Sequence, residues 1–176
     1  MGVGLSLRLG FEEIASGLAA FEGVHRRFEQ LGEWRGAAVI DDYAHHPTEV
    51  TATLDAARQS FPKGRLHVVF QPHLFSRTQD QAEGFGRALL LADRAIVTDV
   101  YASREAPIPG VTGELVVEAA LRSGHKNVHY CPDWHQAATL LAGSGAEGVA
   151  AGDVVMTLGA GDIYRLARQL VGREDA

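Results

Sequence analysis

The sequence predicts an α/β fold with a mostly parallel β-sheet and helices on both of its faces. Two observations lead to this prediction: short runs of β-branched and apolar residues recur along the chain, and amphipathic stretches with helical spacing separate them. Strands that alternate with helices form parallel sheets through right-handed crossovers. The expected topology is therefore Rossmann-like, and 176 residues suffice for one such domain.

Five segments have the composition of short buried strands, because Val, Ile and Leu are concentrated in them. They are residues 37–41, 66–71, 95–100, 127–130 and 153–158. An additional segment, residues 26–34, is compatible with one antiparallel strand at the edge of the sheet.

Apolar residues recur every three or four positions between these strands, and such stripes face the core of an α/β domain. The stripes comprise Val50, Leu54, Ala57 and Phe61; Ala82, Phe85 and Leu89; and Ile163, Leu166, Ala167, Leu170 and Val171. Residues 103–113 are the one long irregular stretch, with Pro107, Pro109 and two glycines, and loops of this length often carry function.

The first 22 residues are expected to be a remnant of a preceding domain or a hinge helix, and residues 23–176 to form the α/β domain. Residues 11–21 have the pattern of a helix that ends at Gly23, yet its apolar side chains have no partner in the predicted core. The chain also contains no G-x-x-x-x-G-K-[ST] motif, and its only lysines are Lys63 and Lys126. Both observations indicate that an upstream domain belongs to the complete protein.

Composition argues against several classes of protein. The net charge of −6 disfavours a general affinity for nucleic acid, so an anionic ligand would need locally placed arginines and backbone N–H groups. Cys131 is the only cysteine, which excludes an intrachain disulfide and a multi-cysteine zinc site. No apolar run approaches the roughly 20 residues that span a bilayer. We therefore expect a soluble, cytoplasmic protein without membrane contact.

Polar residues are concentrated in the loops that follow the predicted strands, where ligands bind in an open parallel sheet. These loops read DDYAHHP at 41–47, QPHLFSRT at 71–78, DVY at 99–101 and GAGD at 159–162. Pro47 suits the first position of a helix, and Thr78 and Gln81 have the spacing of a capping box. All four loops are expected to open onto one rim.

Most candidate residues in these loops also have a purely structural explanation. Asp42 is equally compatible with capping the next turn, and Tyr43 with ordinary packing. The pair His45-His46 indicates metal only weakly, because no C-x-x-C motif completes a zinc site. An arginine such as Arg77, at a helix start on the rim, can hold a carboxylate or phosphate through two N–H groups.

Two segments resemble the C-terminal domain of MurC-type Mur ligases, namely DDYAHHPTEV at 41–50 and FQPHLFSRT at 70–78. Three more are similar in the same order: GVHRRFE at 23–29, DVYASREAPIPG at 99–110 and LGAGDI at 158–163. The resemblance implies a three-domain amide ligase that uses ATP and Mg²⁺ to add L-alanine to UDP-N-acetylmuramate in peptidoglycan precursor synthesis. The missing N-terminal and central domains would bind UDP and carry the P-loop. This domain would close over ATP and substrate, and would be inactive alone.

The resemblance also assigns roles to individual residues. Arg27 would reach the ATP phosphates, Asp42 would hold the ribose or nucleotide, and Tyr43 would lie against the nucleotide. The two catalytic residues, which also bind substrate, would face the muramyl carboxylate and the incoming alanine; these are His45 and Arg77.

His73 would be a further substrate-binding neighbour of these two catalytic residues. Some MurC sequences carry an arginine at the position of Leu74, so that a clamp of two arginines would here be reduced to Arg77. No metal site is expected within the chain.

Two other classes of function stay open at this point. One is a stand-alone module that binds a nucleotide or UDP-sugar without catalysis. The other is a small metallohydrolase, because carboxylate and imidazole groups can hold zinc or a similar ion. Its ligands would be Asp42, His45, His46 and His73.

Overall fold

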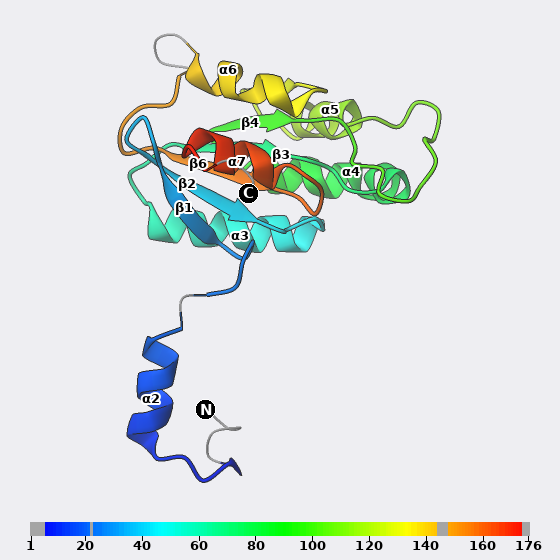
Figure 1. Cartoon of the computed structure of the whole chain (residues 1–176). Helices are drawn as coiled ribbons and strands as arrows, with labels where there is room; N and C mark the ends of the chain where they lie inside the picture. Colours follow the sequence, from blue (N-terminus) through cyan, green and yellow to red (C-terminus); the bar gives the residue numbers. More distant parts are fainter. Residues whose placement is uncertain (1–5, 22, 144–147, 174–176) are drawn as a thin grey trace.

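A six-stranded β-sheet forms the centre of the chain in the computed structural model, which describes residues 6–21, 23–143 and 148–173 (Figure 1). The strands are β1 (Glu29–Trp34), β2 (Ala37–Asp42), β3 (Leu66–Phe70), β4 (Arg94–Val97), β5 (Val128–Tyr130) and β6 (Val154–Leu158). Their order in the sheet is β1-β2-β6-β3-β4-β5. β1 pairs antiparallel with β2, whereas the other neighbours are parallel. The predicted α/β class and its antiparallel edge strand are confirmed.

Helices connect the strands and cover both faces of the sheet. They are α2 (Phe11–Ala19), α3 (Pro47–Ser60), α4 (Phe75–Leu89), α5 (Glu114–Arg122), the 3₁₀ helix η1 (Trp134–Gln136), α6 (Ala137–Ala142) and α7 (Tyr164–Leu170). The predicted apolar stripes lie in or directly beside α3, α4 and α7. The sequence-based prediction missed α5 and α6.

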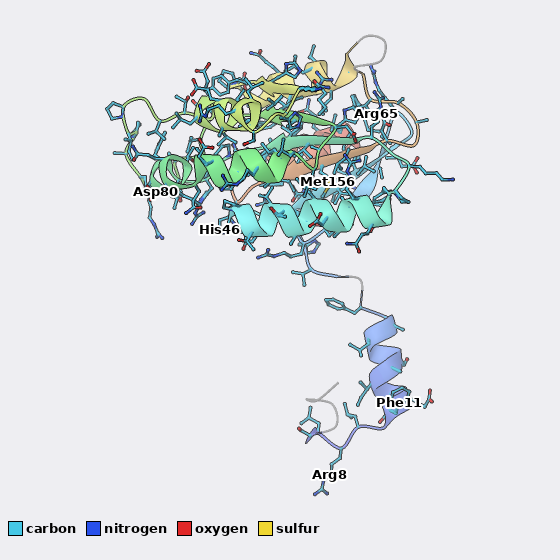
Figure 2. All side chains as sticks on the ribbon, turned by 180° about the vertical axis from the view of Figure 1, so that it is seen from behind. Arg8, Phe11, His46, Arg65, Asp80 and Met156 are labelled. Carbon is cyan, nitrogen blue, oxygen red and sulfur yellow. The ribbon has the colours of Figure 1, made fainter. Side chains whose placement is uncertain are left out.

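Successive side chains of the central strand β3 point to opposite faces of the sheet, and each face has its own apolar core. Val68 and Phe70 pack with residues of α3, α4 and α5 on the face that Figure 2 turns towards the viewer. Val69 packs with residues of α6 and α7 on the other face. All five residues of β3 are therefore buried, as is typical of a parallel strand covered on both sides.

Helix α4 begins four residues earlier than its sequence pattern predicts. The predicted capping residue Thr78 lies inside the helix, where its hydroxyl donates a hydrogen bond of 2.8 Å to the Leu74 carbonyl. The first turn is instead capped from the long loop, because Glu105 accepts hydrogen bonds from the backbone N–H of Ser76 at 3.0 Å and from its hydroxyl at 2.6 Å. The prediction was wrong here because the cap is distant in sequence.

The helix α2 stands apart from the α/β body in Figures 1 and 2, joined to it by a single connecting segment. Large apolar side chains are exposed on α2 and directly after it. Phe11 is 62% exposed, Leu18 57% and Phe21 65%. Residues 1–5 and 22 of the predicted remnant lie outside the described residues. None of the helices in the described part of the chain combines the length and apolar character that crossing a bilayer requires.

A buried ionic network joins the amino ends of β3 and β6. Asp153 accepts hydrogen bonds from Arg65 Nη2 at 2.6 Å, from the Ala150 N–H at 2.9 Å and from His67 Nε2 at 3.1 Å. Burial opposes ionisation of Asp153, but these hydrogen bonds outweigh it and lower the pKa of the carboxyl from 3.8 to about 2. The ionised carboxylate therefore stabilises the fold.

Replacing Asp153 by asparagine is expected to lower the free energy of unfolding by about 1 to 2 kcal/mol at pH 7, allowing for partial solvent exposure of Arg65. Because the pKa of Asp153 is depressed in the fold, its contribution is complete above about pH 4 and is lost as pH falls towards 2. Urea unfolding of both proteins at pH 7 and near pH 2.5 measures this. If the two proteins differed in free energy of unfolding by the same amount at both pH values, the prediction would be contradicted.

Candidate functional site

The loops that follow β2, β3, β4 and β6 meet at one edge of the sheet. Backbone hydrogen bonds connect them in pairs: Gly159 N–H donates to the Asp42 carbonyl at 3.1 Å, and Gln71 N–H to the Leu158 carbonyl at 2.9 Å. Tyr101 N–H donates to the Pro72 carbonyl at 2.8 Å. The predicted common rim is therefore present, and its loops are fixed to one another.

Asp42 is 5% exposed and both of its carboxylate oxygens accept backbone N–H groups. Oδ2 lies 2.7 Å from the nitrogen of Phe28, and Oδ1 lies 2.8 Å from that of Ala44. The side chain thus joins the end of β2 to the turn before β1. This is a structural role, and the binding of ribose by Asp42 stays a prediction.

Arg27 and Tyr43, the other two residues expected at the nucleotide, lie close together. The Cζ atom of Arg27 is 5.6 Å from the centroid of the Tyr43 ring. The exposed Arg27 side chain borders a cavity of about 490 Å³. This cavity is lined by Gly23, Val24, His25, Arg27, Phe28, Glu29 and Gln30.

The three residues expected at the substrate converge from the loops after β2 and β3 and from the first turn of α4. Nη1 of Arg77 lies 3.4 Å from Nδ1 of His73 and 3.5 Å from the carbonyl oxygen of His45. The rings of His45 and His73 meet edge to face with centroids 5.8 Å apart. All three side chains are partly buried. Because they lie together on the rim, we call them the basic patch.

Two tyrosines extend this patch on either side. The Tyr43 ring lies edge to face with the His45 ring, 5.2 Å between centroids. On the other side Tyr101 stacks on His73, with the ring planes 14° apart and the centroids at 5.9 Å. The predicted nucleotide and substrate residues are therefore parts of one continuous surface.

The backbone between the patch and α4 adopts an uncommon conformation. Leu74 has φ of 71°, the left-handed region that non-glycine residues seldom occupy. Its N–H donates to the Tyr101 carbonyl at 3.0 Å, so that the loop after β4 holds it in place. This bend directs the chain from His73 into α4, which brings Arg77 back to His73 one turn later.

Burial lowers the pKa of His73, and the charges of Arg77 and His45 lower it further. His73 is therefore neutral at pH 7. Because Nδ1 of His73 lies within hydrogen-bonding distance of the Arg77 guanidinium, which only donates, the neutral ring carries its proton on Nε2. This tautomer can donate a hydrogen bond to an anionic ligand.

The titration of His73 can be followed by NMR. We expect its pKa to lie below the ordinary value of 6.5 and to rise when Arg77 is replaced by glutamine, because one positive neighbour is removed. Arg87→Gln, near the far end of the same helix, is the matched control and is expected to leave the titration unchanged. A titration of His73 that is the same in all three proteins would contradict the assigned cause.

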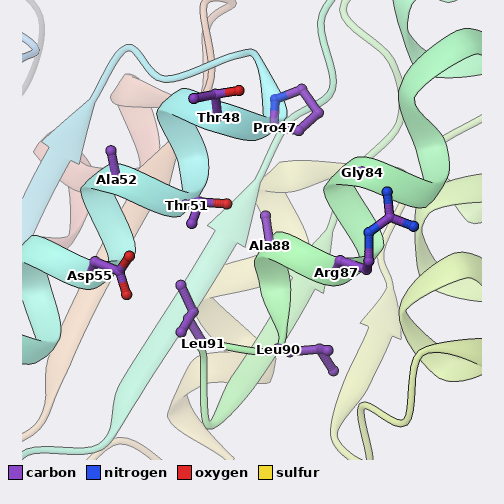
Figure 3. A pocket seen from close by; sticks show the side chains of 10 residues that line it. All are labelled: Pro47, Thr48, Thr51, Ala52, Asp55, Gly84, Arg87, Ala88, Leu90 and Leu91. Carbon is purple, nitrogen blue, oxygen red and sulfur yellow. The ribbon is translucent and has the colours of Figure 1, made fainter.

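A further cavity lies along the groove between α3 and α4 (Figure 3). It measures about 790 Å³ and has a mostly apolar lining. The lining comprises Pro47, Thr48, Thr51, Ala52, Asp55, Gly84, Arg87, Ala88, Leu90 and Leu91. Few titratable groups line this groove. We therefore place the candidate functional site at the rim, where such groups converge, and not in the groove.

Within residues 6–21, 23–143 and 148–173, no group of three or more His, Cys, Asp or Glu side chains is placed to hold a metal ion. His46, one of the ligands of the hypothetical metallohydrolase, is exposed and accepts a hydrogen bond from the Thr48 N–H at 3.4 Å as the N-cap of α3 (Figure 2). Nδ1 of His45 lies 2.9 Å from the Tyr43 carbonyl oxygen. Since Nδ1 donates there, Nε2 is the nitrogen of His45 left for a ligand.

Arg26 was not among the predicted site residues, yet its side chain has more polar contacts than any of them. Its Nε donates to Asp41 at 3.0 Å, and its other nitrogens donate to the carbonyls of Gly159 and Gly161. In the sequence, only its position next to Arg27 pointed to Arg26 as a site residue. The partners of Arg26 lie 15 or more residues away, so spacing alone did not reveal them.

Comparison with known proteins identifies similar domains. The family model described as Mur ligase, glutamate ligase domain, matches residues 26–161. A UDP-N-acetylmuramate–L-alanine ligase from Salinibacter ruber is 51% identical over 171 residues, 97% of this chain and 35% of that protein. One from Cutibacterium acnes is 50% identical with the same coverage. The crystal structure of the Thermotoga maritima UDP-N-acetylmuramate-alanine ligase superimposes with a TM-score of 0.78 at 29% identity, covering 98% of this chain and 35% of that one. This chain thus spans about a third of the length of the relatives it matches.

Proposed function

The chain belongs to the Mur ligase family through its glutamate ligase domain, and on that premise we propose that it is the C-terminal, closing domain of an ATP-dependent ligase that joins L-alanine to UDP-N-acetylmuramate. Relatives that are half identical over nearly all of this chain carry the name of that ligase. Their additional length would supply the N-terminal and central domains as partners. In peptidoglycan precursor synthesis this domain would complete a site that it does not form alone.

The convergence of His45, His73 and Arg77 is the observation that carries the proposal. In the proposed reaction ATP phosphorylates the lactyl carboxylate of the muramate, and the alanine amine attacks the acyl phosphate. The resulting tetrahedral intermediate then expels phosphate. Negative charge develops on oxygen at each step, and donors fixed in place before the reaction stabilise such charge most effectively.

Individual groups of the patch fit this chemistry. Arg77 provides a permanent positive charge and paired N–H donors for a carboxylate or phosphate. The Nε2–H of neutral His73 provides one further donor beside it. Nε2 of His45 offers a lone pair or, in the doubly protonated ring, another donor. Because the His45 ring lies against the Tyr43 ring, His45 would stand between substrate and nucleotide.

The nucleotide would meet the other half of the rim. We propose that Arg27 contacts the phosphates of ATP, that Tyr43 lies against the nucleotide and that Asp42 holds its ribose. The carboxylates here do not fit a magnesium site, because Asp42 accepts two backbone N–H groups while Asp41 is engaged by Thr157 and Arg26. We therefore propose that the part of the ligase outside this chain holds Mg²⁺ together with the P-loop.

A fusion protein tests this function. The region of the Salinibacter ruber relative that this chain matches is replaced by the 176 residues, and phosphate release is measured with ATP, Mg²⁺, UDP-N-acetylmuramate and L-alanine. We expect release that depends on L-alanine from the fusion and none from the chain alone. Omission of L-alanine is the control.

Two outcomes would contradict the proposal. The first is alanine-dependent phosphate release by the isolated chain. The second is a folded fusion without activity, and if the chain nevertheless bound ATP, that result would favour a stand-alone nucleotide-binding module.

A further inference from the structure

Through its guanidinium group, Arg26 binds two separate segments of the rim, the end of β2 and the turn after β6. Nε donates to Oδ2 of Asp41 at 3.0 Å, Nη1 to the Gly161 carbonyl at 3.2 Å and Nη2 to the Gly159 carbonyl at 2.6 Å. The Asp41 carboxylate is 1% exposed and accepts a further hydrogen bond from the Thr157 hydroxyl at 2.6 Å. Three donors on fixed acceptors hold the plane of the guanidinium in one orientation.

Two aromatic rings lie against this group. The Cζ atom of Arg26 is 4.9 Å from the centroid of the Tyr43 ring and 4.7 Å from that of the Tyr164 ring. Cation–π contacts of this kind orient both partners. Tyr43 is the residue proposed to lie against the nucleotide, and Tyr164 begins α7, so Arg26 connects the nucleotide side of the rim with the β6–α7 turn.

The backbone of Arg26 shapes the turn that carries Arg27. Arg26 has φ of 57° and Phe28 has φ of 47°, so Arg27 stands between two residues in the left-handed region. The Arg26 carbonyl accepts a hydrogen bond of 2.7 Å from Tyr43 N–H. The direction of Arg27 and the place of Tyr43 therefore both depend on Arg26.

We propose that Arg26 is a positioning residue for the nucleotide, which holds Arg27 and Tyr43 in the arrangement that ATP requires. The inference rests on the proposed function, because Arg27 and Tyr43 are the residues proposed there to contact ATP. Arg26 acts through them and not as a ligand, since its charge is paired with buried Asp41 and its three observed donors point to protein acceptors.

The test uses the full 176-residue chain and NMR titration with ATP and Mg²⁺. Without nucleotide, the Arg26 Nε–H resonance is expected to be visible at pH 7, because the hydrogen bond to buried Asp41 slows exchange with water. With nucleotide, amide shifts are expected at residues 26–28 and 42–45. Arg26→Lys keeps the positive charge but loses the planar guanidinium with its several N–H donors. We expect this variant to keep the fold and to bind ATP about tenfold more weakly.

Arg165→Lys is the matched control. Arg165 also lies against Tyr164, with its Cζ atom 6.0 Å from the ring centroid, but it belongs to α7 and not to the turn that carries Arg27. We expect wild-type affinity for this variant. Should Arg26→Lys fail to fold, Tyr164→Leu removes one of the two rings that hold the guanidinium, and weaker ATP binding is again expected.

Unchanged ATP affinity in a folded Arg26→Lys protein, or in Tyr164→Leu where the first variant does not fold, would overturn the inference. A wild-type chain without ATP-dependent shifts at these loops would overturn it as well. The ligase proposal is judged separately by the activity of the fusion protein. An active fusion with an Arg26→Lys chain that binds ATP normally would therefore reject only the positioning role.

Discussion

Replacing Arg77 by alanine is expected to lower the alanine-dependent turnover of the fusion ligase by about 100- to 1,000-fold, the usual cost of losing one group that stabilises charge in the transition state. Arg77 is the only permanently charged member of the basic patch, and His73, whose pKa is lowered, does not replace its charge at pH 7. Steady-state phosphate release at saturating ATP measures the effect.

Two further variants separate chemistry from folding. Arg77→Lys retains the charge but not the paired donors, so an intermediate rate is expected. Arg87→Ala removes an exposed arginine from the same helix, beside the groove in Figure 3, and is expected to leave turnover unchanged. Full activity of Arg77→Ala, or equal losses in Arg77→Ala and Arg87→Ala, would remove Arg77 from the proposed site.

The sequence predicted those strands and helices whose apolar residues recur with a regular local spacing. Strands such as β3 and β6 are buried on both faces, and their continuous apolar runs are visible in the chain. Helix α5 escaped prediction because it directly follows the irregular stretch that ends at Gly113. The start of α4 was misplaced because Glu105 caps it from the loop after β4, a partner that no local rule identifies.

The sequence predicted the location of the site, because the topology of a parallel sheet determines where the loops meet. The carboxyl ends of parallel strands share one edge, so the loops that carry His45, His73 and Arg77 had to meet. The contacts within that edge were not predictable. Arg26 binds residues from β2 and from the turn after β6, and only the folded sheet brings these together.

The glycine turn after β6 has a structural role. A side chain at Gly159 would place its Cβ atom 2.7 Å from the Gln71 carbonyl oxygen, and Gly159 has φ of 147°. Glycine is required here because two loops of the rim approach each other closely. The same approach lets the Gly159 carbonyl accept the hydrogen bond from Arg26.

Replacing Phe85 by alanine is expected to lower the free energy of unfolding by about 3 to 5 kcal/mol, the usual range for truncating a buried aromatic residue. Phe85 is fully buried, and its ring centroid lies 4.9 Å from that of Phe70. Phe70 ends the strand that leads to His73, while Phe85 belongs to the helix that carries Arg77. The pair thus attaches the helix to the strand beneath the patch, and urea unfolding measures its contribution.

Phe85→Leu is the matched control, because it keeps most of the apolar volume, and we expect a loss of less than about 2 kcal/mol. In the fusion ligase, Phe85→Ala is also expected to reduce turnover at temperatures where the domain is still folded, since α4 is then held less firmly against β3. A loss below about 1 kcal/mol for Phe85→Ala would show that the helix is anchored mainly elsewhere, for example where Gly86 packs against the backbone of α5. Retained stability together with reduced turnover would instead assign this contact to the geometry of the patch, because Phe85 belongs to the helix that carries Arg77.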